Sequence, residues 1–449
     1  MRHAIHAFIM LGLIGTFTAA PGAVTMPAVF GDHMVLQREV PVAIFGQADP
    51  NEQIQVSFAG DTKTTKADAK GAWLVHLDPM PANAKGETLA VRGSNTITFT
   101  DVVVGEVWVG SGQSNMRWTL ERSLGKEAVL SAGSNPAIRT FMVPFPKEPR
   151  KKKNYNPKDY WSWHISDKSS LREFSAVQYY FGARLQAELG VPVGLICSAR
   201  GSSSIDPWQV GGGFYEPMIK PLQPFTVRGV IWYQGESDVQ RKTHLTYKDE
   251  FQRLITEWRA TWQLPEMPFY YVQIAPWSGD KYAAGDLPIL WEAQAAALKL
   301  PHTGMAVVTD KVDSLGNIHP YDKQPVGDRL ALWALARDFG QDVAYSGPLF
   351  KAATVEGKQI RISFAHAEGL QSSDGQELTE FRIAGADGSF VDAQAVIDGE
   401  TIVVSSPQVS SPKQVQFGWH NTAQPNLVNG AGLPASPFHT NDWQGGTGD

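Results

Sequence analysis

A serine, a histidine and an amide side chain, far apart along the chain, have the residue types that acyl transfer needs. Ser114 follows an apolar run, Gln234 follows another, and His319 precedes a helix-like segment. An imidazole that takes the proton of a hydroxyl makes it a nucleophile for an ester carbonyl, and N–H donors stabilise the resulting oxyanion. These residues predict an acyl-transfer site with a serine nucleophile, although the string around Ser114 fits an ordinary helix N-cap equally well.

Other kinds of site are possible with neighbouring residues. Glu236 and Asp238 follow the same apolar run as Gln234 and could act as the paired carboxylates of a glycosidase. That mechanism gives Gln234 no task, and the other loops offer few carboxylates to complete it. No two histidines lie at ligand spacing near a carboxylate, so we expect no metal ion.

The elements that must position these residues follow from the hydrophobic pattern. Alternating valines between 102 and 109 predict a strand, a Gly-Ser-Gly turn ends it, and a helix is expected from Gln113 through Leu130. We expect further helices at 174–189, 247–262, 290–300 and 323–339, and strands at 191–197, 227–233, 269–274 and 305–309. Such repeated units form a parallel sheet whose polar loops meet at the carboxyl edge of the strands. The candidate residues are therefore expected at one edge of an α/β fold.

All-β patterns flank this region. Short strand-like runs separated by turn signals occupy residues 26–100 and return from about residue 341, with a spacing that suits β-sandwich-like regions. We therefore expect a signal peptide at 1–23, an N-terminal β-domain at 24–100, a catalytic domain at 101–340 and a C-terminal β-rich region at 341–449.

The composition narrows the partners and the compartment. The 449 residues are 43% hydrophobic and 19% charged with a net charge of −6, which is typical of a globular protein and argues against nucleic acid as a partner. A basic start, a short apolar run and small residues near Ala20 predict a secretory signal peptide, and hence a secreted or periplasmic protein. No later apolar run is long enough for a membrane span. The 14 tryptophans could stack on sugars, which leaves a non-catalytic carbohydrate-binding protein as another alternative.

Five strings carry a resemblance to a known family. They are GEVWVGSGQSNM, GVIWYQGESD, NIHPYDKQPVGDRLA, PAVFGDHMVLQR near the start and GLPASPFHT near the end. Over essentially the whole mature chain, the sequence resembles the sialate O-acetylesterase family of the wider SGNH hydrolase group. The resemblance implies a flavodoxin-like α/β core with β-rich flanks, no cofactor, and hydrolysis of O-acetyl esters on sugars. Acetylated sialic acid is the namesake substrate, and acetylated xylan or xyloglucan is the alternative.

The resemblance also implies roles for individual residues. Ser114 matches the nucleophile and His319 the general base. Gly201 and Gln234 match positions that would form an oxyanion hole together with the Ser114 N–H. We expect four further residues to contact the substrate, with the two arginines as partners for a sugar carboxylate: Asn115, Arg117, Arg200 and Glu236.

Two positions depart from the family pattern. Ser202 replaces a glycine next to Gly201, which would move a backbone donor. Asn317 and Gly316 stand where related enzymes carry an aspartate before the histidine. We therefore predict a Ser–His dyad in which a neutral group orients the imidazole. The candidate orienting groups are a carbonyl within residues 315–317, the Asn317 side chain, or Asp310 or Asp313 folding back. On this basis, Asn317→Asp is expected to leave activity within a few-fold or to raise it.

Overall fold

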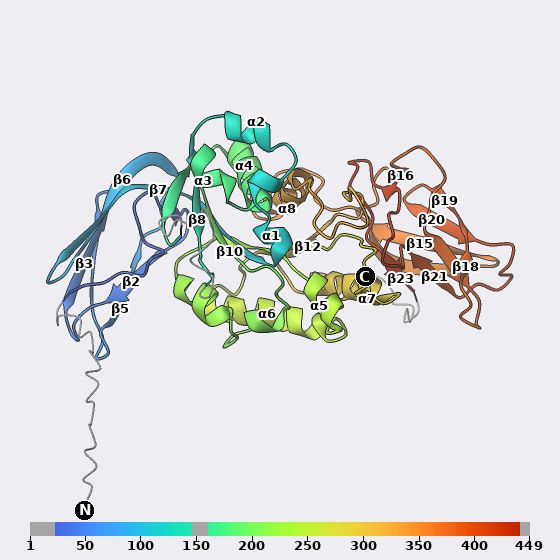
Figure 1. Ribbon diagram of the computed structural model, residues 1–449, viewed down its shortest axis with the longest axis horizontal. Coiled ribbons are helices and arrows are strands. Elements are labelled where there is room, and N and C mark those ends of the chain that lie inside the picture. The colour runs from blue at the N-terminus through green and yellow to red at the C-terminus, as the bar shows by residue number, and fades with distance from the viewer. Residues whose placement is uncertain (1–22, 146–159, 441–449) are drawn as a thin grey trace, which may run out of the picture.

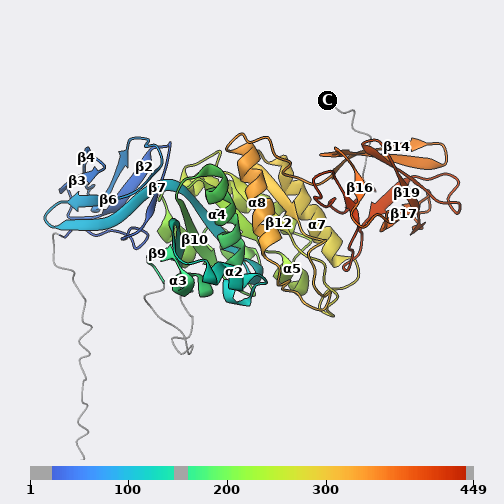
Figure 2. The same ribbon diagram turned by 90° about the horizontal axis from the view of Figure 1, so that it is seen from above.

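One long strand, β7 (Thr96–Gly112), links two parts of the molecule. The computed structural model describes residues 23–145 and 160–440, so residues 1–22 of the predicted signal peptide lie outside the described part of the chain. The first six residues of β7 alternate in exposure, and every residue from Val102 to Gly112 is buried. This change marks the point where β7 passes from a sheet with one solvent face into a sheet covered on both faces. The predicted boundary between residues 100 and 101 lies inside this continuous strand (Figure 2).

The central sheet is mostly parallel, as the repeated strand and helix patterns predicted. Its strands lie in the order β13-β12-β11-β7-β10-β8-β9, and all neighbours except β8 and β9 run parallel. Besides β7, these strands are β8 (Asn135–Met142), β9 (Trp163–Ser166), β10 (Val193–Ala199), β11 (Gly229–Tyr233), β12 (Phe269–Gln273) and β13 (Thr303–Val307). The loops that follow β7, β10 and β11 therefore leave the sheet side by side.

Helices cover both faces of this sheet (Figure 1). One layer contains α4 (Ala176–Leu189) and α8 (Gln324–Arg337), which pack against each other. The opposite layer contains α5 (Glu236–Arg241), α6 (Tyr247–Trp262) and α7 (Asp286–Ala296). Shorter segments are α2 (Lys126–Ser131), α3 (Lys168–Arg172), η3 (Asp206–Trp208), η4 (Tyr215–Ile219), η5 (Lys220–Leu222) and η6 (Ala297–Lys299). In the described residues, no helix has both the length and the apolar character that a membrane span requires.

The predicted helix from Gln113 through Leu130 is wrong. Helix α1 contains only Ser114–Arg117, because the next residue, Trp118, has an extended backbone with φ −57° and ψ 119°. Thr119 then forms an antiparallel bridge with Ser175, and the chain continues into the short helix η1 (Leu120–Arg122). Pairing with a distant segment thus overrides the local helical pattern after one turn.

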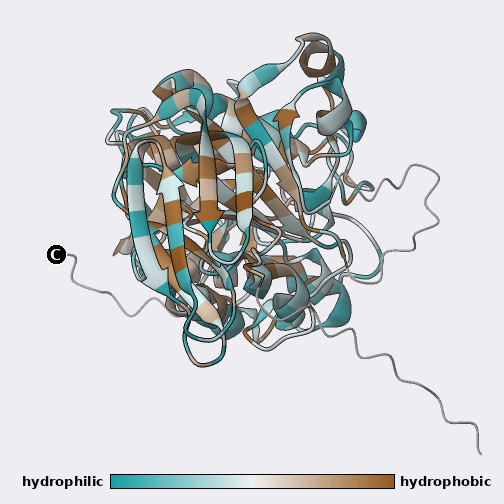
Figure 3. Ribbon diagram, turned by 90° about the vertical axis from the view of Figure 1, so that its left-hand side faces the viewer, coloured by the Kyte–Doolittle hydropathy of each residue, from teal (hydrophilic) through white to brown (hydrophobic). Residues whose placement is uncertain are grey.

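The N-terminal region is built on β7. Strands β1 (Val35–Gln37) and β6 (Asn83–Arg92) pair with it, and β3 (Gln53–Phe58) and β4 (Asp61–Lys66) extend the sheet from β6. A separate pair contains β2 (Val42–Gln47) and β5 (Ala72–Leu77). Apolar and polar residues alternate along the strands nearest the viewer in Figure 3, as expected for sheets with one solvent face. This region and the central sheet share one hydrophobic core.

The C-terminal region has a hydrophobic core of its own. Its two four-stranded sheets have the orders β14-β15-β20-β19 and β18-β17-β21-β23, and β16 pairs with β22. The strands are β14 (Leu349–Glu356), β15 (Gln359–Ala365), β16 (Gln371–Ser372), β17 (Phe381–Ala384), β18 (Val391–Asp392), β19 (Gln394–Asp398), β20 (Thr401–Ser405), β21 (Gln414–Phe417), β22 (Leu427–Val428) and β23 (Phe438–His439). The mixed α/β architecture with β-rich regions at both ends is therefore as predicted.

Candidate active site

Ser114 and His319 meet at the carboxyl edge of the central sheet. The Nε2 atom of His319 lies 2.8 Å from the Oγ atom of Ser114, although 205 positions separate them in the chain. Ser114 begins α1 directly after β7, and His319 lies in the loop between β13 and α8. This is hydrogen-bond contact between a hydroxyl and an imidazole, the geometry of a serine activated by a neighbouring base.

Gly112 sets the sharp turn that presents Ser114. Its φ is +125°, and a Cβ atom on Gly112 would lie 2.3 Å from the carbonyl oxygen of Tyr233 in the adjacent strand. Both features require glycine, because an L side chain would be strained in that conformation and would clash with β11. Gly112 thus allows the close approach of β7 and β11 beneath the serine, whereas Gly110, the first glycine of the Gly-Ser-Gly string, leaves room for the Gln178 side chain of α4.

Gly201 lies beside Ser114, as predicted. A Cβ atom on Gly201 would be 3.7 Å from the Cβ atom of Ser114. Within residues 23–145 and 160–440, the backbone N–H groups of Ser114 and Gly201 donate to no protein acceptor. Two N–H groups next to a nucleophile have the chemistry required to stabilise an oxyanion.

Ser202 retains a glycine-like backbone. Its φ of +59° falls in the left-handed region, which costs a residue other than glycine roughly 1 kcal/mol or more. The chain therefore accepts local strain at the position where the family pattern has glycine, and the backbone next to Gly201 keeps the left-handed conformation.

The structure does not support the predicted role of Gln234 as an oxyanion donor. Gln234 is completely buried, and its Nε2 atom lies 3.2 Å from Oε1 of Gln113, 3.1 Å from the carbonyl oxygen of Ser203 and within hydrogen-bond distance of the Asp238 carboxylate. An amide nitrogen has only two hydrogens, so three protein acceptors leave none for a substrate. Gln234 instead ties together the loops that follow β7, β10 and β11.

Asn115 and Glu236, predicted as substrate contacts, are buried and hydrogen-bonded to each other. Asn115 Nδ2 donates to the Glu236 carboxylate and, at 3.1 Å, to the carbonyl oxygen of Ile318. Asn115 Oδ1 accepts a hydrogen bond of 2.6 Å from Nζ of Lys323. Glu236 is 2% exposed, and the other two side chains are 0% exposed, so no surface is left for a substrate. The network instead holds the loop that carries His319.

Lys323 was not identified from the sequence. It is the N-cap residue of α8, four positions after His319, and the only signal was a lysine at the start of an apolar helical pattern. Burial lowers the pKa of Lys323 to about 7 and raises the pKa of Glu236 to about 7. Both shifts have the same cause, because removal from water disfavours the charged form of either group.

The two predicted arginines contact protein groups. Arg117 donates a hydrogen bond of 2.8 Å to the carbonyl oxygen of Glu173. The guanidinium of Arg200 lies 4.2 Å from the centre of the Phe145 ring. Both arginines are half-buried. Arg117 lies three positions after Ser114 in the chain, and Arg200 directly precedes Gly201.

None of the predicted orienting groups is hydrogen-bonded to the imidazole of His319 in the described part of the chain. The Asn317 side chain binds the backbone of His319 instead, accepting from its N–H at 3.0 Å and donating to its carbonyl oxygen at 2.8 Å. Asp313 accepts from Asn317 Nδ2 at 3.2 Å, and Asp310 forms a bidentate pair with Arg329. The missing aspartate is therefore not replaced by another carboxylate.

Burial and two cations keep His319 neutral. Burial lowers its pKa to about 4, with further contributions from the positive charges of Lys323 and Arg122. A neutral imidazole is the form that accepts a proton from a hydroxyl. His319 is thus in the base form over a wide range of pH.

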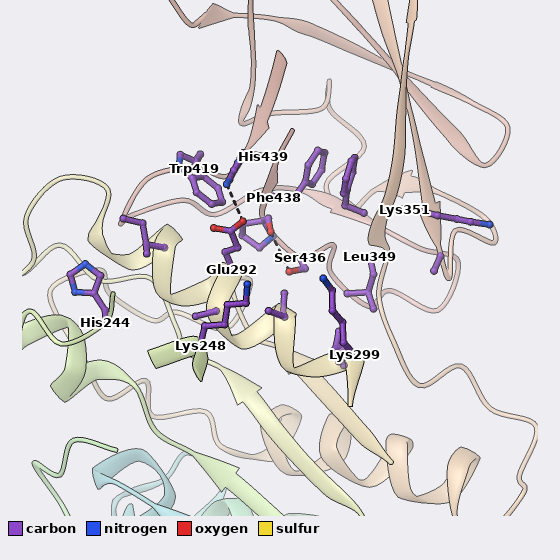
Figure 4. Close-up of a pocket in the computed structure, with 18 of the residues that line it drawn as sticks. His244, Lys248, Glu292, Lys299, Leu349, Lys351, Trp419, Ser436, Phe438 and His439 are labelled. Atoms are coloured by element: carbon purple, nitrogen blue, oxygen red, sulfur yellow. Dashed lines mark hydrogen bonds and ion pairs between the residues drawn. The ribbon is translucent and has the colours of Figure 1, made fainter. Parts of the chain in front are cut away.

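A separate cavity of about 690 Å³ lies away from this site, between α7 and the C-terminal strands. Figure 4 shows Lys248 and Lys299 on its helical side and Trp419, Phe438 and His439 on the strand side. Neither Ser114 nor His319 lines it. Among the described residues, no group of three or more His, Cys, Asp or Glu side chains is arranged to hold a metal ion.

Comparison with known proteins gives the family. Residues 104–331 match the family model of carbohydrate esterases described as sialic acid-specific acetylesterases. The sialate O-acetylesterase of Homo sapiens is 31% identical over 374 residues, which cover 70% of this chain and 71% of that protein. The Mus musculus sialate O-acetylesterase is 28% identical, covering 76% and 78%.

A solved structure is similar over nearly the whole length. The crystal structure of a carbohydrate acetylesterase from Xanthomonas citri has a TM-score of 0.86 and 36% identity, covering 94% of this chain and 100% of that chain. The family model and these relatives are carbohydrate esterases, which supports an esterase over the glycosidase and the non-catalytic binding protein that the sequence left open. The chain belongs to the sialate O-acetylesterase family and is a carbohydrate O-acetylesterase.

Proposed function

We propose that this carbohydrate O-acetylesterase works through Ser114 as nucleophile and His319 as general base, with an acetyl-enzyme intermediate. The observation that carries the proposal is the 2.8 Å contact between His319 Nε2 and Ser114 Oγ. The neutral state of His319 supports it further, because a protonated imidazole could not accept the hydroxyl proton.

The first half of the reaction transfers the acetyl group to the enzyme. Ser114 Oγ attacks the acetyl carbonyl carbon while its proton passes to His319 Nε2. The N–H groups of Ser114 and Gly201 stabilise the negative charge that develops on the carbonyl oxygen. The tetrahedral intermediate then expels the sugar oxygen, which takes the proton from His319 and leaves as a hydroxyl.

The second half releases acetate. Water attacks the acetyl carbon of the Ser114 ester, and His319 accepts a proton from that water. A second tetrahedral intermediate collapses, the bond to Ser114 Oγ breaks, and the proton on His319 returns to the serine. The enzyme is regenerated, and one ester and one water have become one alcohol and one acetic acid.

We propose O-acetylated sialic acid as the substrate, with acetylated xylan or xyloglucan as the alternative. The sialate O-acetylesterases among the relatives support the first, and the carbohydrate acetylesterase structure is compatible with both. A sialate carboxylate needs a cation, and Arg117 and Arg200 are the cations next to Ser114 and Gly201 in the chain. Binding through either would require it to exchange its protein contact for the sugar.

The deciding experiment compares acetate release by the wild type, Ser114→Ala and His319→Gln on all three substrates. We expect release from at least one substrate by the wild type, and a loss of about 1000-fold or more in both variants. Circular dichroism and thermal melting show whether each variant is folded. A folded Ser114→Ala protein with wild-type turnover would overturn the mechanism.

The proposal includes export and a finer description of the fold. The signal-peptide pattern at residues 1–23 supports secretion, which N-terminal sequencing of protein recovered from the periplasm or medium would test. The spatial order β10-β7-β11-β12-β13 corresponds to 2-1-3-4-5 in chain order when these five strands are numbered alone. This order supports a flavodoxin-like core, with β8 and β9 added at one edge.

A further inference from the structure

The indole of Trp118 stacks on the imidazole of His319. The ring centres are 5.0 Å apart and the planes differ by 20°. We propose that Trp118 is a positioning residue that holds the His319 ring against Ser114, in the place of the carboxylate that a catalytic triad uses. This inference rests on the proposed function, because it concerns the base of that mechanism.

The backbone of His319 is restrained more tightly than its imidazole ring. Its backbone is held on both sides of the residue, since Asn317 bonds its N–H and carbonyl groups and Asn115 bonds the carbonyl oxygen of Ile318. The ring is held at Nε2 by Ser114 alone among hydrogen-bonding groups of the described residues. Rotation of the imidazole about its side-chain bonds is therefore the motion that a further contact must restrict.

Trp118 is mounted rigidly enough to restrict that motion. Its carbonyl oxygen accepts a hydrogen bond of 2.8 Å from the N–H of Ala176, at the start of α4. The next residue, Thr119, forms the bridge with Ser175, and the N–H of Leu120 donates to Phe174 at 2.9 Å. The extended backbone that ends α1 is thus fixed to a second segment and turns the indole over His319.

The charges around the rings are consistent with this arrangement. The Arg122 guanidinium lies 4.7 Å and Lys323 Nζ lies 5.8 Å from the centre of the Trp118 ring. Cations are attracted to the face of an indole, so the contact with Trp118 favours the position of Arg122 near His319, whereas Lys323 is held by Asn115 Oδ1 at 2.6 Å. Two acidic groups near the loop are hydrogen-bonded to other residues, since Asp313 accepts from Tyr321 and Asn317, and Glu236 is bonded to Asn115. Asp322, in the same loop, acts on Lys323 through its charge. The imidazole therefore has positive neighbours and a buried face.

The consequence is a base positioned by packing. A triad carboxylate orients the imidazole and stabilises the imidazolium. An indole supplies the orientation, while burial and the two cations favour the neutral ring. Removal of the indole should loosen the geometry and admit water to the face of the imidazole.

The test compares Trp118→Leu with Trp118→Phe by kcat, KM and pH profile on the acetylated substrate that the wild type hydrolyses best. Trp118→Leu is expected to lower kcat by about 10- to 100-fold with little change in KM. It should also move the acidic limb of kcat/KM upward, toward the ordinary histidine pKa of 6.5. Trp118→Phe keeps an aromatic face and should restore most of the activity and of the pH profile.

Trp419→Leu is the matched control. Trp419 packs against another histidine, His439, with ring centres 4.4 Å apart, in the C-terminal region. Its loss should leave kcat and the pH profile unchanged. A folded Trp118→Leu protein with wild-type kcat and an unshifted acidic limb would overturn the inference, as would a Trp118→Phe variant no better than Trp118→Leu. If Trp118→Leu does not fold, Trp118→Met takes its place, and a folded Trp118→Met protein with wild-type kcat and an unshifted acidic limb overturns the inference.

These outcomes are separable from failure of the proposed function. If Ser114→Ala and His319→Gln retain activity, the mechanism is wrong whatever Trp118 does. If both abolish activity and the Trp118 variants behave like wild type, the mechanism stands and only the positioning role of Trp118 is wrong.

Discussion

Lys323 donates a hydrogen bond of 2.6 Å to Oδ1 of Asn115, in a place where both side chains are 0% exposed. Through Asn115, this ammonium group is linked to the buried carboxyl of Glu236 and to the loop that carries His319. Removing one member of such a buried hydrogen-bonded network destabilises the protein, because the polar atoms left behind have no water to bind.

We therefore expect Lys323→Met to lower the free energy of unfolding by about 3 kcal/mol, measured by urea denaturation. The double variant Lys323→Met with Glu236→Gln should be less destabilised than the sum of the single variants, because the paired charge is removed with its partner. Strict additivity of the three free energies would show that the two residues are not coupled.

The acidic limb of kcat/KM should lie near pH 4. The pKa of His319 is lowered to about 4 by burial and by two cations, so the imidazole binds its proton only below that pH in the folded protein. At pH 5 only about a tenth of the enzyme would carry a protonated base, whereas an ordinary histidine would be almost fully protonated there.

The stability linkage of His319 has a definite sign. A lowered pKa means that the unfolded chain binds more protons than the folded protein between pH 6.5 and about pH 4. The contribution of His319 to stability is therefore present above pH 6.5 and is lost as the pH falls through 4. A kcat/KM profile measured from pH 3.5 to 8 tests whether the acidic limb lies near pH 4, and a midpoint near 6.5 would contradict that expectation.

Asn317→Asp should now lower kcat, contrary to the expectation from the sequence. Asn317 lies on the backbone of His319, and its Nδ2 donates both to the His319 carbonyl oxygen and to Asp313. A carboxylate at position 317 has no N–H donors and faces the like charge of Asp313. This should destabilise the catalytic arrangement of the loop by about 1–2 kcal/mol and lower kcat roughly 10-fold.

The exchange of both residues is the control for Asn317→Asp. Asp313→Asn combined with Asn317→Asp restores a complementary amide and carboxylate pair, and should recover part of the lost activity. If Asn317→Asp alone is as active as the wild type, the hydrogen bonds between the Asn317 side chain and the His319 backbone do not matter for catalysis.

Gln234→Ala should chiefly destabilise the protein. The Gln234 amide binds Gln113, Ser203 and Asp238, and Tyr247 donates to its oxygen at 3.0 Å. Removing it leaves several buried polar groups unpaired, at about 1–3 kcal/mol. An oxyanion donor would behave differently, since its loss lowers kcat by about 100- to 1000-fold without a matching loss of stability. Urea denaturation and kcat measured on the same preparation distinguish the two roles.

The sequence by itself determined where the chemistry lies. Alternating strand and helix patterns predict a parallel sheet, and the loops after its strands must meet at one edge, which is enough to bring Ser114, Gly201 and His319 together. The string around Ser114 and the motif before α8 also identify the family. These inferences succeed because strand periodicity and loop position are local properties that survive folding.

Only the tertiary structure decided how each polar side chain is used. Nothing in the sequence shows that the side-chain amides of Gln234 and Asn115 are occupied. In the structure each is hydrogen-bonded to a buried side chain more than 100 positions away, Gln113 and Glu236 respectively. Trp118 falls inside a predicted helix, and its place over His319 depends on the bridge between Thr119 and Ser175. Hydrogen-bond partners and ring contacts depend on side chains from distant segments, and the periodicity of one segment carries no information about them.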